Sequence, residues 1–255
     1  MTAPCVASTR PRLDPRPVRH RIGLVALATD HTTELDFARI LSPRGIGVYV
    51  NRVPYANPVT PETLRAMEPA LTDCAGLILP EEGLDAVVYG CTSASVVIGD
   101  AAVRAAIMRA KPGTKVITPV SATLAGLRAM GARRISVLTP YTVATSAPMA
   151  QLFEAEGFEL DRFTCLDMAD DREMARIAPD SIVELAQEAA AAGSDALFIS
   201  CTAVRAAAEI DRIEAAVGMP TLSSNYAAAW AVLRHLGDQG AGAPGHLMTL
   251  PAGAP

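Results

Sequence analysis

The strongest constraint on the fold of this 255-residue chain is an internal repeat. The stretch Asp85–Thr92 (DAVVYGCT) begins with Asp, continues through apolar residues and ends in Cys-Thr, and Asp195–Thr202 (DALFISCT) repeats that pattern 110 residues further on. Short apolar runs of this kind, each followed by helix-like sequence, predict buried strands. The repeat therefore predicts two half-chains, each with a Cys-Thr pair at the end of a buried strand.

Other segments of the two half-chains match in the same order. Arg21–Val25 (RIGLV) matches Arg134–Leu138 (RISVL), and Lys115–Thr118 matches Met219–Leu222. Short apolar strands alternate with helix-like segments along the chain, and several of those segments end at glycine, as helices often do. Such alternation is typical of α/β proteins with parallel sheets covered on both faces. We therefore predict an α/β fold of two similar lobes, each a short parallel sheet flanked by helices.

The same patterns predict the domain boundaries. Residues 1–20 are rich in Pro and Arg and are expected to be a disordered leader. The N-terminal lobe is expected to cover residues 21–118 together with 221–237, and the C-terminal lobe residues 119–220. Residues 238–255, rich in Gly, Ala and Pro, are expected to be a loose tail.

Composition and charge argue against several classes of protein. The formal net charge is −5 and no basic block occurs, which disfavours nucleic-acid binding through charge. No apolar run approaches the roughly 20 residues of a membrane span, and the first residues lack the apolar region of a secretory signal. The 5 cysteines are widely spread and the 4 histidines make no metal-ligand spacing. We therefore predict a cytoplasmic protein with no metal, no cofactor, and no nucleic-acid or membrane partner.

The place of each repeated cysteine, after a strand and before a helix, predicts its chemistry. Ligands of parallel sheets sit beyond the carboxyl ends of the strands, where Cys91 and Cys201 fall. A thiol at a helix N-terminus feels the positive end of the helix dipole, so its pKa is expected to fall and its thiolate to act as base or nucleophile. The hydroxyl and backbone N–H groups of Thr92, Ser93 and Thr202 are suited to hold a carboxylate or enolate oxygen.

Two such thiols on opposite sides of a cleft favour two kinds of reaction. They could act as acid and base on opposite faces of one carbon, as racemisation requires, or one thiolate could add to a double bond while the other handles the proton. Neither route requires a metal or a cofactor. The alternative is that each cysteine is only a small buried apolar residue, which is the commoner role of a single cysteine at a strand end. Two cysteines at equivalent positions favour a catalytic role instead. Cys5, Cys74 and Cys165 have no such context and are expected to be structural or incidental.

The cysteine motifs resemble those of the aspartate/glutamate racemase superfamily. Within it, the chain is most similar to the branch that holds maleate cis-trans isomerases, arylmalonate decarboxylases and the ectoine-utilisation protein. The likeness covers about residues 21 to 237 and rests on these segments: Gly90–Ser93 (GCTS), Ser200–Thr202 (SCT), Arg21–Val25, Leu138–Tyr141 (LTPY), and Ser223–Asn225 followed by Trp230.

The resemblance implies a two-lobed fold with a pseudo-twofold axis, no cofactor, and paired cysteines between the lobes. It implies that Cys91 is the nucleophile or first base and that Cys201 is the opposing acid or base. Thr92 and Ser93 would supply oxyanion contacts, and Tyr141 would donate a hydrogen bond to the substrate carboxylate. Decarboxylases of this group keep only the second cysteine, with glycine at the first site, so two cysteines favour an isomerase or racemase.

Two acidic residues depart from the pattern of that branch. Maleate isomerases place one Asn after the first strand and another after the sixth, both touching the substrate carboxylate, whereas this chain has Asp30 and Asp171 in those regions. An ionised Asp repels a carboxylate, whereas Asn can donate to it. If both line the cleft, a substrate with an ammonium or amide group fits better, as in ectoine breakdown, which passes through diamino acid derivatives. Otherwise Asp30 is a helix N-cap and Asp171 belongs to an acidic loop.

The sequence thus favours a cofactor-independent isomerase or racemase that acts on a small carboxylate or amino-acid derivative through Cys91 and Cys201. Two alternatives stay open. One is a decarboxylase of a malonate-like acid with Cys201 as proton donor, and the other is a non-catalytic small-molecule binding protein on the same scaffold. A homo-oligomer is compatible with the resemblance, since relatives are often dimers or larger.

Overall fold

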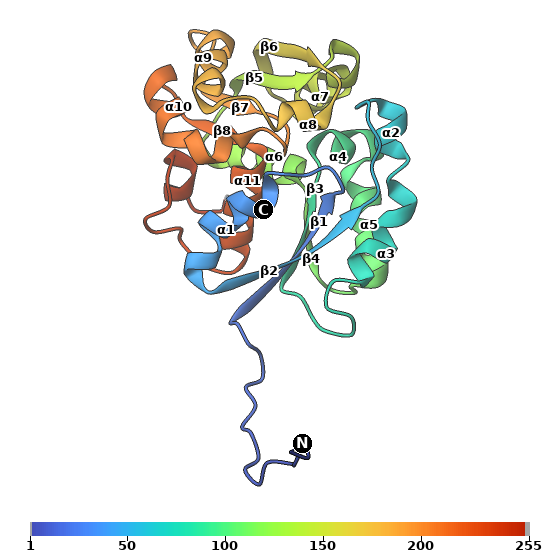
Figure 1. Ribbon diagram of the computed structural model, residues 1–255. Coiled ribbons are helices and arrows are strands. Elements are labelled where there is room, and N and C mark those ends of the chain that lie inside the picture. Colours follow the sequence, from blue (N-terminus) through green and yellow to red (C-terminus); the bar gives the residue numbers. More distant parts are fainter. Residues whose placement is uncertain (1, 253–255) are drawn as a thin grey trace.

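The computed structural model describes residues 2–252 and contains two four-stranded parallel sheets (Figure 1). The first sheet has the order β2-β1-β3-β4, built from β1 (His20–Leu27), β2 (Ile46–Val53), β3 (Ala86–Gly90) and β4 (Lys115–Ile117). The second has the order β6-β5-β7-β8, built from β5 (Arg134–Tyr141), β6 (Glu159–Met168), β7 (Ala196–Ile199) and β8 (Thr221–Ser223). The two orders correspond strand for strand, which confirms the predicted α/β fold of two similar lobes.

Helices cover both sheets and alternate with the strands. The first half contributes α1 (Thr33–Ile40), α2 (Pro61–Arg65), α3 (Leu71–Gly76), α4 (Thr92–Ile98), α5 (Asp100–Ala110) and α6 (Pro119–Ala129). The second half contributes α7 (Val143–Ala155), α8 (Asp171–Met174), α9 (Pro179–Ala189), α10 (Ile210–Val217) and α11 (Ser224–His235). Within the described range, residues 2–252, no helix combines the length and the apolar character needed to cross a membrane.

The repeated Asp before each Cys-Thr strand has the same role in both halves. Asp85 Oδ2 accepts from the backbone N–H of Arg21 at 2.7 Å, and Asp195 Oδ2 accepts from the backbone N–H of Arg134 at 2.8 Å. Each carboxylate therefore binds the start of the neighbouring central strand, β1 or β5, which pairs with the Cys-Thr strand. The sequence repeat thus reflects a structural equivalence between the halves.

The central strands are buried along almost their whole length, and this places their carboxyl ends inside the molecule. β1, β3, β5 and β7 are buried nearly throughout, whereas the edge strands β2 and β6 are half-exposed. The helices α6 and α11 pack against each other, and both contact β3 and β8 (Figure 1). They therefore join the two sheets at the level where the Cys-Thr strands end.

The segments that follow the two Cys-Thr pairs differ in structure. The helical segment after Cys91 is broken at Gly99, between α4 and α5, and the φ of 93° at this residue lies in the left-handed region that glycine adopts without strain. The segment after Cys201 forms a 3₁₀-helix, Arg205–Glu209, before α10. The second Cys-Thr pair is thus followed by a turn rather than directly by an α-helix.

The predicted lobe boundary is wrong at β8. This strand pairs with β7 in the second sheet, so residues 221–223 belong to the C-terminal half rather than to the N-terminal lobe. The helix α11 that follows contacts α1, β3 and β4 of the first half as well as β8. The chain therefore crosses from one half to the other at Ser223 and Ser224.

The predicted loose tail is also wrong over most of its length. A 3₁₀-helix spans His246–Thr249, where Leu247 and Met248 are buried. The carbonyl oxygen of Leu250 accepts from Trp230 Nε1 at 3.2 Å and from Arg234 Nε at 2.7 Å. The tail therefore packs on α11, and apolar side chains within a Gly- and Pro-rich segment supply the contact.

The predicted leader has no helix or strand from residue 2 to residue 19, and the side chains of residues 2–17 are exposed. Its last part contacts the folded body, where Arg16 Nη1 lies 3.3 Å from the carboxylate of Asp85. Residue 1 of the leader and residues 253–255 of the tail lie outside the described residues.

Candidate active site

Cys91 lies at the junction of β3 and α4, where its extended backbone (φ −147°, ψ 116°) makes it the N-cap residue of α4. Its side chain is buried, with 4% of its surface exposed. The thiol lies 3.7 Å from the hydroxyl of Ser93. The strand-to-helix junction thus presents the sulfur together with the hydroxyl of the first helical turn.

Cys201 follows β7 in a strained turn. Its φ of 89° is unusual for a residue with a side chain and costs roughly 1–3 kcal/mol. The thiol is 3% exposed and accepts from the backbone N–H of Ala203 at 3.3 Å. The surrounding contacts must hold this conformation, because an isolated turn would relax from it.

One hydrogen bond joins the two Cys-Thr segments directly, and a second joins the first segment to α11. The hydroxyl of Thr202 donates to the carbonyl oxygen of Gly90 at 3.1 Å, and the hydroxyl of Thr92 donates to Ser224 Oγ at 2.7 Å. Both threonine hydroxyls, expected to face the substrate, therefore bind protein groups in this structure. Ser93, in contrast, faces the Cys91 thiol.

Tyr141, at the end of β5, lies near both cysteines. Burial raises its pKa well above the usual value, and the neighbouring thiols of Cys201 and Cys91 raise it further. Hydrogen bonding from Tyr141 lowers the pKa of the Cys201 thiol, and Ser93 lowers that of Tyr141 in the same way. The structure therefore brings Cys91, Cys201, Ser93 and Tyr141 together, as expected.

The expected fall in thiol pKa is wrong for both cysteines. Burial raises the pKa of Cys91 to about 12, and the carboxylates of Asp171 and Asp30 add to that rise. The Ala94 N–H and the Ser93 hydroxyl act in the opposite direction but do not compensate for the loss of solvent. Burial, and then the charge of Asp171, also raises the pKa of Cys201. Both thiols are therefore neutral at pH 7, and a base must take the proton from one of them before that sulfur can act as a nucleophile or base.

Asp30 binds the start of a helix and also has an oxygen without a hydrogen-bond partner among the described residues. Its Oδ1 accepts from the backbone N–H groups of Thr32 and Thr33, at 2.7 and 3.0 Å, at the start of α1. Its Oδ2 is buried and, among the residues that the structure describes, has no hydrogen-bond partner. The carboxylate is only 7% exposed. The N-cap residue of α1 is Thr32, so Asp30 binds the start of the helix from two residues before the N-cap, and one of its oxygens stays available as an acceptor.

Asp171 is buried at the start of α8, with 6% exposure, rather than part of a solvated acidic loop. Its Oδ2 accepts from the hydroxyl of Thr29 at 2.6 Å, and its backbone N–H donates to Asn57 Oδ1 at 3.0 Å. Burial raises the pKa of this carboxyl, and the charge of Asp30 adds to the rise. Two carboxylates therefore lie close to each other and to the cysteines.

Tyr55 is a site residue that sequence reasoning missed. Burial raises the pKa of its hydroxyl above the usual value, and Cys91, Asp171 and Cys201 raise it further. The hydroxyl oxygen is buried and makes no hydrogen bond with any residue between 2 and 252. Tyr55 follows β2, and its place beyond the carboxyl end of a parallel strand was the signal that could have identified it.

The site is built from thiol, hydroxyl and carboxyl groups. Among the described residues, no cluster of three or more His, Cys, Asp and Glu side chains is arranged to hold a metal ion. A small carbon acid bound between Cys91 and Cys201 would have one proton-transfer group on each side, with Tyr141 and Ser93 as hydrogen-bond donors.

Fold and site together define a two-lobed α/β protein with a pair of buried cysteines, one contributed by each half. The sequence model of the arylmalonate decarboxylase family matches residues 57–248. The chain therefore belongs to the arylmalonate decarboxylase family.

Individual relatives agree with this assignment. The chain is 28% identical over 226 residues to the maleate isomerase of Nocardia farcinica (strain IFM 10152), covering 85% of this chain and 90% of that protein. It is 31% identical over 193 residues to the arylmalonate decarboxylase of Bordetella bronchiseptica, covering 74% and 80%. A solved structure of the Nocardia farcinica maleate cis-trans isomerase, a cysteine-to-serine variant with a covalently bound succinylcysteine intermediate, superposes with a TM-score of 0.83. It is 26% identical, and the superposition covers 90% of this chain and 98% of that one.

Proposed function

We propose that this protein is a cofactor-independent isomerase or racemase that acts on a small carboxylate through Cys91 and Cys201. The observation that carries the proposal is the position of the two thiols, which come from equivalent strands of the two halves and both lie next to Tyr141. The similarity to maleate isomerases, one of them with a covalent succinylcysteine intermediate, supports the isomerase assignment.

For cis–trans isomerisation, the thiolate of Cys91 adds to one carbon of the double bond and forms a C–S bond. The π electron pair takes the proton of the Cys201 thiol at the other carbon, and the resulting single bond rotates. The Cys201 thiolate then takes that proton back, the double bond re-forms and Cys91 leaves as a thiolate. Because burial raises the pKa of Cys91 to about 12, the thiol must first give its proton to a base. In this proposal the base is the carboxylate of Asp171, whose own pKa burial raises, and the proton returns to Cys91 when the product leaves.

Racemisation would use the same two groups without a covalent bond. One thiolate removes the proton next to the carboxylate, and the electron pair is held as an enolate. The opposite thiol then donates its proton to the other face of the same carbon. The Ser93 hydroxyl, the Tyr141 hydroxyl and the backbone N–H groups after Cys91 would hold the enolate oxygens.

Asp30 and Asp171 favour one chemical class of substrate over another. In this proposal both carboxylates line the substrate site and accept hydrogen bonds from an ammonium or amide group, which favours an amino-acid derivative over maleate. The free Oδ2 of Asp30 and the raised pKa of Asp171 support this, because a second anionic group would add to an already unfavourable concentration of negative charge. A diamino acid derivative, of the kind through which ectoine breakdown passes, belongs to this class.

The substrate assignment is tested with Asp171→Asn. The variant should lose activity on a diamino acid derivative relative to maleate, because the amide no longer attracts an ammonium group and can donate to a carboxylate. An unchanged ratio of kcat/KM values for the two compounds would show that Asp171 does not contact the substrate. Asp180→Asn, on the exposed face of α9, is the control, since the Asp180 side chain is 82% exposed.

The reaction is tested by ¹H NMR in D₂O, which detects both isomerisation and exchange of the reacting C–H. Cys91→Ala and Cys201→Ala should each lower turnover about a thousandfold or more, with the melting temperature little changed. Cys165→Ala, on β6, is the matched control. Unchanged turnover in both site variants would refute the proposal.

Two further functions also have observations in their favour. The family match and the decarboxylase relative favour release of CO₂ from a malonate-like acid, with Cys201 as proton donor. Detection of released CO₂, as gas or by ¹³C NMR with phenylmalonate as substrate, distinguishes this reaction from isomerisation. The raised pKa values of both thiols favour a non-catalytic binding protein. Saturable binding of small carboxylates without turnover of any of them would support that role.

A further inference from the structure

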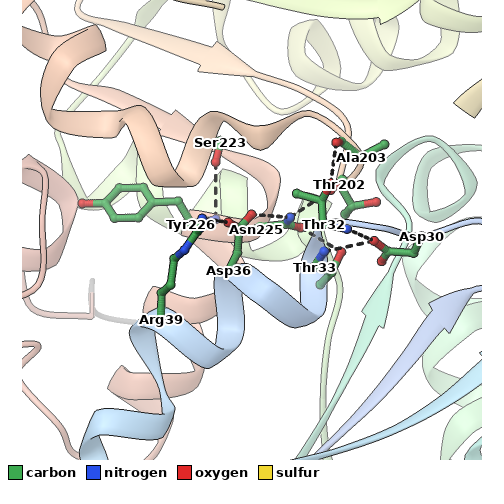
Figure 2. A network of polar contacts seen from close by, with 10 residues as sticks. All are labelled: Asp30, Thr32, Thr33, Asp36, Arg39, Thr202, Ala203, Ser223, Asn225 and Tyr226. Carbon is green, nitrogen blue, oxygen red and sulfur yellow. Dashed lines mark hydrogen bonds and ion pairs between the residues drawn. The ribbon is translucent and has the colours of Figure 1, made fainter. Parts of the chain in front are cut away.

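A buried amide, that of Asn225, connects Asp36 in the first half of the chain to Thr202 in the second (Figure 2). Asn225, in the first turn of α11, donates from Nδ2 to Asp36 Oδ2 and to the carbonyl oxygen of Thr202, both at 2.9 Å. Asn225 and Asp36 are each 2% exposed. This amide therefore lies between a carboxylate of α1 and the backbone of the Cys201 turn.

The surroundings allow only one orientation of the Asn225 amide. Both of its hydrogens face acceptors, and its Oδ1 accepts from the hydroxyl of Thr33 at 3.4 Å. A flipped amide would direct its oxygen at the carboxylate of Asp36 and the carbonyl of Thr202, both of which only accept. Asp36 therefore determines that the amide donates to Thr202.

Thr202 is the residue through which this contact reaches the site. It follows Cys201 directly, and its hydroxyl donates to the carbonyl oxygen of Gly90, the residue before Cys91. The next carbonyl, that of Ala203, accepts from the hydroxyl of Thr32 at 2.8 Å. The strained turn of Cys201 is therefore held by side chains from α1 and α11, outside its own lobe's sheet.

We propose that Asn225, oriented by Asp36, is a positioning residue that keeps the Cys201 turn aligned with Cys91. The proposal rests on the function proposed for the two thiols. Its claim that Asn225 maintains the backbone conformation of the Cys201 turn can be tested separately from that function. Without the amide donor, the Thr202 carbonyl loses a buried partner and the positive φ of Cys201 loses one of the contacts that maintain it.

The test compares Asp36→Ala with Asp36→Asn by alkylation with iodoacetamide, read at each cysteine by peptide mass spectrometry. Asp36→Ala removes the acceptor that orients the amide, so Cys201 should react about tenfold faster than in the unmodified protein while Cys74 does not change. Asp36→Asn keeps an oxygen that accepts from Asn225, so its Cys201 should react within about twofold of the original rate. Arg39→Ala is the control, because it removes only the ion pair to Asp36, at 3.5 Å.

A second variant keeps the test decisive if Asp36→Ala does not fold. Asn225→Leu has a side chain of similar size that cannot donate to Thr202, so it should accelerate Cys201 alkylation to a similar degree. Equal Cys201 rates in Asn225→Leu, or in Asp36→Ala, and the unmodified protein would overturn the proposal. So would an Asp36→Asn rate equal to that of Asp36→Ala, since the side chain would then act only through its charge.

The alkylation result does not depend on turnover, so it separates this proposal from the proposed reaction. If Cys91→Ala and Cys201→Ala both leave activity unchanged, the reaction mechanism fails, while the turn can still respond as expected in the Asp36 variants. Where activity is measurable, Asp36→Ala should lower kcat about tenfold with KM nearly unchanged, and Asp36→Asn should restore it.

Discussion

The hydroxyl of Thr202 donates to the carbonyl oxygen of Gly90 at 3.1 Å, and this bond joins the residue after one site cysteine to the residue before the other. The sequence repeat places these two segments in separate halves. The bond crosses between the halves at the ends of β3 and β7, so it couples the position of Cys91 to that of Cys201.

Thr202→Val should therefore affect both stability and activity. The Gly90 carbonyl loses a buried partner, which costs roughly 1–3 kcal/mol in the free energy of unfolding by urea denaturation. Turnover should fall about tenfold, because the thiols lose their alignment. Thr72→Val is the matched control, since the Thr72 hydroxyl makes a similar bond to the Ala106 carbonyl, at 2.8 Å, away from the site. Equal turnover in the two variants would contradict the coupling.

The thiol of Cys91 should ionise only in strong base. Because burial raises its pKa to about 12, the rate of its alkylation should rise about tenfold per pH unit from pH 7 to 10 without a plateau. An unperturbed thiol levels off near its pKa of ~8.5. Peptide-resolved mass spectrometry over this range measures the profile, and a plateau below pH 9 would show an activated thiolate instead.

Asp36 should make the protein less stable at neutral pH than in mild acid. Burial raises its pKa from 3.8 to about 6, against the opposing effects of Asn225 and Arg39, while Asp30 raises it slightly further. The folded state therefore binds this proton more tightly than the unfolded state. The contribution of this proton to the free energy of unfolding is fully present below pH 3.8 and is lost as the pH rises to about 6. The loss is on the order of 2–3 kcal/mol.

The measurement for Asp36 is the free energy of unfolding at pH 4 to 7, in the original protein and in Asp36→Asn. The amide does not titrate, so the difference between the two proteins should change across this window. A constant difference would show that Asp36 keeps its ordinary pKa. Asp180→Asn, at an exposed site, should follow the original protein throughout.

Tyr55→Phe should separate a substrate contact from a packing role. The Tyr55 hydroxyl is buried and makes no hydrogen bond to any described residue, so its removal should leave the melting temperature equal or slightly higher. If the hydroxyl binds substrate, kcat/KM should fall about tenfold. Tyr49→Phe, on the half-exposed strand β2, serves as the control. A lower melting temperature with normal kinetics would assign Tyr55 to packing alone.

Local pattern by itself determined the strand–helix order, the two equivalent halves and the place of Cys91 and Cys201 at strand ends. Those features depend on runs of a few residues, such as the apolar stretch before each Cys-Thr pair and the Asp that starts it. Backbone hydrogen bonding and burial of apolar side chains make such runs form strands in many contexts, which is why they are readable without coordinates.

Tertiary structure alone decided the electrostatics of the site. A cysteine at the start of a helix predicts a low pKa, but the solvent that Cys91 loses and the charge of Asp171, 80 residues away, reverse the sign. The position of Tyr55 in the site and the packing of the tail on Trp230 also depend on which distant segments come into contact. For the thiols, the loss of solvent caused by those contacts outweighs the short-range effect of the helix N-terminus that the sequence pattern indicates.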